Sequence, residues 1–201
     1  MDYYARAKKF ILKNARPLDM ARWNYLFENG SKEDVINILK TYQNTDGGFA
    51  NALEPDCWNI NSTPLQTWAA TRIIKEINLD DKNHPIIKGI IDSLSSNDEF
   101  DGHRWNALNI KQVITYDTKR WSNDYICKPS LFIDSKSSDF YLENKDICDF
   151  ECQFILNIQN NDGSWNVTWD WNNYLEEWAI SKNWWKSDII IKNIKYIKEF
   201  Q

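Results

Sequence analysis

The chain has 201 residues, 42% of them apolar, and a net charge of −5. That length suffices for one substantial hydrophobic core, so the first expectation is a single domain over 1–201. Lysine and arginine are scattered, which argues against a nucleic-acid-binding surface, and no apolar run reaches the roughly 20 residues that cross a bilayer. Aromatic residues make up 14% and include 11 Trp, which either pack between helices or line a cavity.

Apolar periodicity predicts helices from the start of the chain. The first covers 2–14. The second begins at Pro17, because proline is favoured in the first helical turn, and runs through Phe27. Ser31 is placed to cap a third helix, with Asp34 three residues later.

Residues 63–66, Thr-Pro-Leu-Gln, form a capping box that predicts a helix reaching Ile77. The same test predicts helices at 86–94, 145–159 and 184–200. Residues 106–135 give no clear assignment, and within them 113–116 has the composition of a short extended stretch.

A motif of the form Gln-x-x-Asp-Gly-x-aromatic occurs twice, at 43–49 and 159–165, each time after an apolar helical run. A degenerate copy, at 98–102, has Trp105 just after it. The glycine suits a turn with positive φ that ends a helix, and the Gln amide can bond to free backbone groups. The motif therefore indicates a repeated helix pair and says little about catalysis.

Residues 42–70, with the Asp-Gly-Gly-Phe turn at 46–49 and the Ser-Thr-Pro helix start at 62–64, resemble the repeat of protein prenyltransferase β subunits and squalene-cyclase-like proteins. Residues 154–185 resemble it again. The resemblance implies an all-α fold, the α/α toroid, in which helix-pair repeats surround an aromatic-lined cavity for an isoprenoid. A six-repeat ring takes roughly 300 residues at about 25 per helix and loop, so this toroid is expected to be shortened or incomplete.

The chain departs from the chemistry of those families. Asp56 and Cys57 are adjacent and neither His84 nor His103 opens a helix of the required kind, so the zinc site of thiol prenylation is not expected. Asp80 is followed directly by a second aspartate, but the preceding aspartate of the cyclase acid motif is missing. We therefore expect no metal and no cofactor.

The four cysteines form no Cys-x-x-Cys pair, and the first residues do not have the pattern of a signal peptide. Cys148 and Cys152 share one helix face, but a metal site there would need further ligands. These features favour reduced thiols in a cytoplasmic protein.

The first candidate cluster follows the first Gln motif. Its catalytic candidates are Asp56 and Glu54, because partial burial beside Trp58 would raise a carboxyl pKa into a range useful for acid–base chemistry. Carboxylates near a helix start are equally explained by the helix dipole. Beside the degenerate third copy, His103 and Trp105 are candidates for ligand binding.

The second cluster follows the second Gln motif and contains Trp169, Trp171, Glu177 and Trp178. Tryptophan alternating with carboxylates suits the stacking of a sugar or the stabilisation of a carbocation, and it also suits a structural clamp between helices. Because both clusters follow a Gln motif by a similar distance, we expect them to face each other across one cavity mouth.

Three functions stay open. The resemblance favours a prenyltransferase- or terpenoid-cyclase-like protein with a cavity for an isoprenoid or similar apolar ligand, although only Arg104 lies near a motif to bind a diphosphate. A carbohydrate-active or carbohydrate-binding toroid is the first alternative. A non-catalytic interaction module is the second, so whether the chain is an enzyme is left open.

Overall fold

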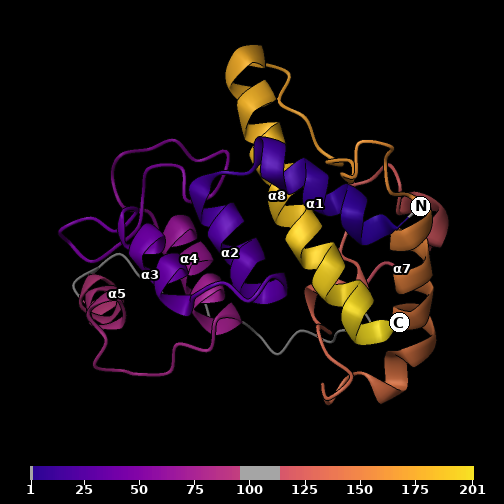
Figure 1. Cartoon of the computed structure of the whole chain (residues 1–201), viewed down its shortest axis with the longest axis horizontal. Coiled ribbons are helices and arrows are strands. Elements are labelled where there is room, and N and C mark those ends of the chain that lie inside the picture. Colours follow the sequence, from indigo (N-terminus) through magenta and orange to yellow (C-terminus); the bar gives the residue numbers. More distant parts are fainter. Residues whose placement is uncertain (1, 96–113) are drawn as a thin grey trace. The chain divides into compact units, whose positions relative to one another are not determined.

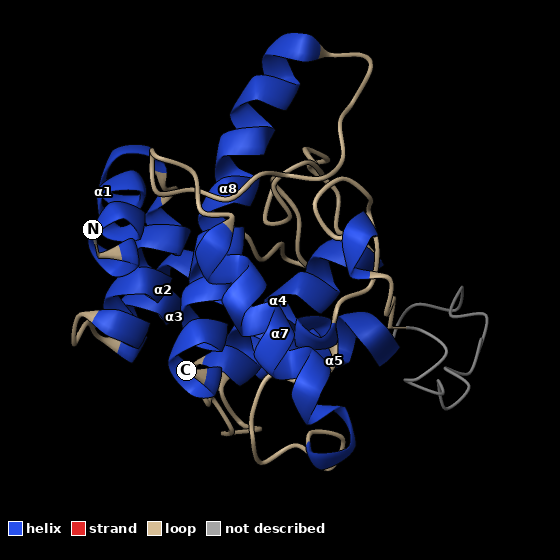
Figure 2. Cartoon of the chain, turned by 90° about the vertical axis from the view of Figure 1, so that its right-hand side faces the viewer, coloured by secondary structure: helices blue, strands red, loops and turns tan. Residues whose placement is uncertain are grey.

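The computed structural model describes residues 2–95 and 114–201, and within them it is all-helical, as predicted (Figure 2). No strand occurs in these residues, and the only β pairing among them is an isolated bridge between Gln43 and Phe49. The α-helices are α1 (Tyr3–Asn14), α2 (Pro17–Phe27), α3 (Lys32–Lys40), α4 (Pro64–Glu76), α5 (Pro85–Ser95), α7 (Lys145–Asn157) and α8 (Leu175–Phe200). Short 3-10 turns are η1 (Thr118–Arg120), η2 (Pro129–Leu131) and η3 (Leu142–Asn144).

The predicted caps of α3 and α4 are confirmed. The Ser31 hydroxyl accepts from the backbone N–H of Asp34, and the Thr63 hydroxyl accepts from that of Gln66. The capping box is only half formed, because the Gln66 side chain accepts from the backbone N–H of Leu53 at 2.9 Å instead of closing back on its own helix. Gln66 therefore attaches the preceding loop to α4.

Two stretches differ from the sequence-based expectation. Helix α8 begins at Leu175 rather than at 184, and Glu176 and Glu177 in its first turn favour this early start through the helix dipole. Residues 114–116 form neither helix nor strand. The degenerate third copy of the motif, at 98–102, lies outside the described residues.

The chain divides into two compact units, which we describe separately. The described part of unit 1 comprises 2–14, 114–179 and 185–201, and that of unit 2 comprises 15–95 and 180–184. Unit 1 therefore contains α1 and α7 with most of α8, and unit 2 contains α2 to α5 (Figure 1).

The core of unit 2 is aliphatic. Every one of its helices contributes to it, and Phe49 of the first Gln motif is buried within it. Its members are Leu18, Ala21, Val35, Ile36, Leu39, Phe49, Leu53, Ala70, Ile73, Ile74, Ile77, Ile86 and Ile90.

The core of unit 1 contains more aromatic side chains. Trp121 is fully buried, and the rings of Phe150 and Phe154 meet it edge-on, each at 5.5 Å between centroids. Trp165 of the second Gln motif is also buried, and its indole N–H donates to the carbonyl of Ile155 at 2.8 Å. Many aromatic residues of this unit thus pack between helices, which was one of the two roles expected for them.

The two Gln motifs have the same internal hydrogen bonds. Gln43 donates through Nε2 to the carbonyl of Gly47 at 2.9 Å, and Gln159 donates to that of Gly163 at 3.1 Å. Both glycines have positive φ, 83° and 90°. The prediction of a left-handed glycine turn held by a Gln amide is confirmed in both copies.

Each motif also contacts the first turn of another helix in its own unit. Gln43 Nε2 donates to the carbonyl of Ile86 in α5 at 3.1 Å, and Gln159 Nε2 donates to that of Tyr3 in α1 at 2.9 Å. A β-carbon added at Gly47 would lie 2.0 Å from the carbonyl oxygen of Gly89. Only glycine permits this close approach of turn to helix.

Candidate functional site

The loop that carries the catalytic candidates of unit 2 is held closely by its own backbone. The N–H of Ala52 donates to the carbonyl of Cys57 at 3.1 Å, and that of Cys57 donates to the carbonyl of Glu54 at 3.0 Å. Asn51 and Ala52 both have positive φ, 61° and 62°, a conformation that non-glycine residues rarely adopt. The loop is therefore compact and locally strained, a combination found often at functional sites.

Trp58, the predicted ligand-binding side chain of this loop, is accessible. Its indole N–H donates to the carbonyl of Pro55 at 2.9 Å, which fixes the ring, and 42% of the side chain stays exposed. The ring lies 5.7 Å from that of Trp184 at a tilt of 35°. The loop also carries Glu54 and Asp56, both half-buried, and one carboxylate oxygen of Glu54, Oε2, is enclosed by the protein.

Arg16 contacts both the ring of Trp184 and the backbone of this loop. Its guanidinium lies 5.3 Å from the centroid of the Trp184 ring. It donates from Nη1 to the carbonyls of Ala52 and Leu53, at 2.5 and 3.3 Å, and forms an ion pair from Nε to Asp19 at 2.8 Å. Arg16 is therefore committed to the protein and attaches the base of the loop to α2.

The ion pair of Arg16 is part of a buried network that the sequence did not reveal. Asp19 also contacts Arg22 at 3.3 Å, and Arg22 contacts Glu76 of α4 at 2.8 Å. All four charged side chains are less than a tenth exposed, and their charges balance. Buried charges are retained only with such partners, so the network fixes α2 against α4.

The second predicted cluster divides into two aromatic groups within unit 1. Trp169 meets Tyr125 at 5.5 Å and Trp185 at 5.2 Å, in both cases edge-on. Trp171 stacks on Trp178 at 5.5 Å and 19°. These contacts are typical of the structural clamp that was one of the alternatives, although Trp169 and Trp171 stay partly accessible.

The remaining members of the predicted site differ in how far they can be placed. Glu177 is exposed in the first turn of α8, and Trp178 is buried. His103 and Trp105 lie outside the described residues. The Glu54–Trp58 loop belongs to unit 2 and the Trp169–Trp178 segment to unit 1, so their meeting at one mouth stays a prediction.

A polar hollow of about 510 Å³ lies beside the first Gln motif in unit 2. It is lined by amide, hydroxyl and carboxylate groups of Asn44, Asp46, Asn61 and Ser62, and Ile60 is its one large apolar side chain. The lining suits a ligand with many hydroxyl groups better than an apolar chain.

Within the described ranges, 2–95 and 114–201, no three His, Cys, Asp or Glu residues gather as metal ligands would. The four cysteines are free thiols. Burial raises the pKa of Cys148 and of Cys152, which keeps both free thiols protonated. None of the helices described is long and apolar enough to cross a bilayer.

Comparisons of the chain with protein-family models, with curated proteins and with solved structures return no match.

Proposed function

We propose that the chain is a toroid-like protein built from helix pairs, and that it binds a carbohydrate on the loop that carries Glu54, Asp56 and Trp58. The repeated contacts of the two Gln motifs support the fold, because each joins a helix end to the first turn of another helix in the same way. A toroid of this size would be the shortened form expected from the sequence.

One observation carries the choice of ligand. Trp58 presents a fixed, 42% exposed indole in the same short loop as Glu54 and Asp56. Sugar rings stack on such a face through their C–H groups while their hydroxyls donate to carboxylate oxygens, and this combination defines the binding of a polyol. The polar hollow of the same unit, between the Gln motif and residues 60–62, would accept further hydroxyl groups.

The isoprenoid function suggested by the family resemblance is the second candidate, supported by that resemblance and by the 11 Trp. A diphosphate substrate would need free cationic side chains near the loop. Arg16 is the cation beside Trp184, and its donors already serve Asp19 and two carbonyls. This geometry favours a neutral ligand over a diphosphate.

If the protein is an enzyme, we propose Asp56 as the acid or base, with Glu54 beside it. Hydrolysis of a glycoside uses two carboxylates, which is consistent with this pair. The predictions of a cytoplasmic location, of no nucleic-acid partner and of no bound metal or cofactor stay part of the proposal.

Ligand-observed NMR with maltotriose, cellotriose and chitotriose tests the proposal, with farnesol as the apolar probe. We expect saturable binding of at least one sugar, lost in Trp58→Ala and weakened in Asp56→Asn. Trp68→Ala is the matched control, because Trp68 is also exposed in unit 2 but contacts Arg72 on α4. Binding of farnesol alone would favour the isoprenoid function. If no probe binds, the non-catalytic interaction module remains as the alternative function.

A further inference from the structure

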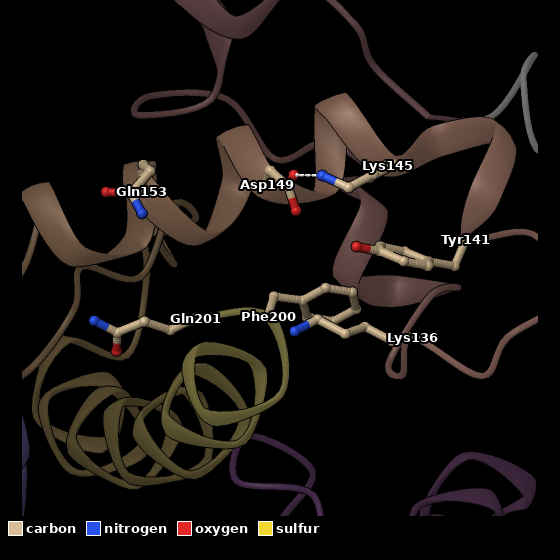
Figure 3. A pocket seen from close by; sticks show the side chains of 7 residues that line it. All are labelled: Lys136, Tyr141, Lys145, Asp149, Gln153, Phe200 and Gln201. Carbon is tan, nitrogen blue, oxygen red and sulfur yellow. Dashed lines mark hydrogen bonds and ion pairs between the residues drawn. The ribbon is translucent and has the colours of Figure 1, made fainter.

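A second hollow, of about 360 Å³, lies within unit 1 between one face of α7 and the last turn of α8 (Figure 3). Lys145, Asp149 and Gln153 line it from α7 at a spacing of four residues, which places them on the same side of the helix. The volume is at the lower end of the range for small-molecule sites. All of its lining residues belong to one unit.

The floor of this hollow is aromatic. The rings of Tyr141 and Phe200 lie 5.4 Å apart, and each side chain is only 7% exposed. The ring of Tyr196 supports Phe200 from within the core at 4.3 Å. The floor is therefore held in place by packing, and only the small exposed parts of the two side chains are available to a ligand.

The rim is polar and carries an excess of positive charge. Lys145 forms an ion pair with Asp149, whereas the Lys136 ammonium has no ion-pair or hydrogen-bond partner in the part of the chain that the structure describes. Lys136 is nonetheless placed by its backbone, because its N–H donates to Glu199 at 2.8 Å. The two ammonium groups and one carboxylate of the lining leave one positive charge, and the nearby carboxylate of Glu199 accepts from the N–H of Lys136 and from the hydroxyl of Ser135.

We propose that this hollow binds a small aromatic anion. The ring of the ligand lies against the exposed edges of Tyr141 and Phe200, and its carboxylate or phosphate lies against Lys136. The hydroxyl of Tyr141 points toward the middle of the hollow, where it can donate to the same anionic group (Figure 3). This site is independent of the carbohydrate proposal, which rests on a loop of unit 2.

Titration of the full chain with benzoate, followed by ligand-observed NMR, tests the proposal, with phenyl phosphate as a second anion and benzyl alcohol as the neutral analogue. We expect saturable binding of an aromatic anion and a dissociation constant about 3- to 10-fold higher in Lys136→Gln, which corresponds to the loss of one exposed charge contact. Tyr141→Phe should weaken binding by a smaller factor. Whichever anion binds more tightly identifies the headgroup.

Lys119→Gln is the matched control, since Lys119 is another exposed lysine of unit 1 that does not line the hollow. Lys136 is itself exposed, so its substitution should leave the fold intact. Benzyl alcohol binding as tightly as benzoate would overturn the proposal. So would equal effects of Lys136→Gln and Lys119→Gln, or no saturable binding of either anion by the wild-type chain.

Discussion

Gln159 donates a hydrogen bond from its side-chain amide to the carbonyl of Tyr3, 156 positions earlier in the chain. Gln43 forms the equivalent bond with Ile86, in the first turn of α5. Helix α1 therefore takes, against the second motif, the place that α5 takes against the first. The N-terminal helix thus packs on the second motif within unit 1.

The first prediction concerns this contact. Gln159→Ala removes the bonds to Tyr3 and Gly163 and leaves two carbonyls without their amide donor. We expect a loss of about 1–3 kcal/mol in the free energy of unfolding, measured by urea denaturation, and faster hydrogen exchange in α1. Gln153→Ala, an exposed glutamine on α7, is the control and should change stability little. Unchanged exchange in α1 would contradict the role assigned to Gln159.

The second prediction concerns the turn glycines. Gly163 has φ of 90°, and an added β-carbon would lie 2.1 Å from the carbonyl oxygen of Arg6. Backbone strain and steric overlap together should make Gly163→Ala cost about 2–5 kcal/mol. Gly163→Asn should cost a similar amount, because asparagine tolerates the dihedral angle but not the contact.

The control for the second prediction is Asn29→Gly, at an exposed position with φ of 58°. There glycine relieves strain without opening a packed contact, so stability should change by only a few tenths of a kcal/mol. Thermal unfolding of the three variants separates the cost of the dihedral angle from that of the overlap. A tolerated Gly163→Ala would show that the turn and α1 separate easily.

The parts of the fold that the sequence predicted are those set by local chemistry. The hydroxyl caps at Ser31 and Thr63 and the left-handed glycines of both motifs depend on residues within a few positions of each other. The start of α8 was missed because a tryptophan-rich stretch with an exposed first turn has no strong apolar periodicity. Local patterns thus located the helices but not every boundary.

The candidate site depends on partners distant in the sequence, and this limited its prediction. The exposed Trp58 and its neighbouring carboxylates are visible in one short segment. The contact of Trp58 with Trp184 and the pairing of Arg22 with Glu76 are not, because many other residues have the same chemistry. Arg16, Asp19 and Arg22 follow one another at intervals of three residues, which places them on one face of α2. This spacing was the one sign of a buried ion-pair network in the sequence.

The third prediction concerns a buried carboxylate of unit 1. Glu151 on α7 is 1% exposed, and its two oxygens accept from the N–H and the hydroxyl of Ser130, both at 2.7 Å. Burial raises its pKa above the ordinary value of 4.5, although the bonds from Ser130 and the charge of Lys128 act in the opposite direction. The folded state therefore holds this proton more tightly than the unfolded state.

It follows that Glu151 lowers the free energy of unfolding as the pH rises from 4.5 through its pKa in the folded state. In Glu151→Gln this loss should disappear because the amide does not titrate, while its single oxygen can keep one of the two bonds from Ser130. Urea denaturation of both proteins between about pH 4.5 and 7 measures the difference in slope. The pKa of Asp162 is lowered. The stability that Asp162 contributes is therefore lost only in more acidic solution, as the pH falls through that pKa. Parallel slopes for the two proteins would contradict this account.

The last prediction concerns a difference between the two motifs. In the second motif, the Oδ1 of Asp162 accepts from the N–H and from the hydroxyl of Ser164, at 2.9 and 2.7 Å. In the first motif a glycine, Gly48, occupies the position of Ser164. There the Oδ1 of Asp46 accepts from the N–H of Gly48 at 2.9 Å and from the hydroxyl of Ser62 at 2.8 Å. Ser62 thus replaces the hydroxyl that Gly48 lacks.

Exchanging the two side chains tests this replacement. Gly48→Ser alone should be destabilising, because a β-carbon there would lie 2.6 Å from that of Ser62. Ser62→Gly alone should cost about 1 kcal/mol through the lost bond to Asp46. The double variant should recover about 1–2 kcal/mol relative to the sum of the single effects. Recovery should be incomplete, because the hydroxyl of Ser93 also lies 2.9 Å from the added β-carbon. Urea denaturation of the four proteins completes the cycle, and additive effects would show that Ser62 does not substitute for the motif serine.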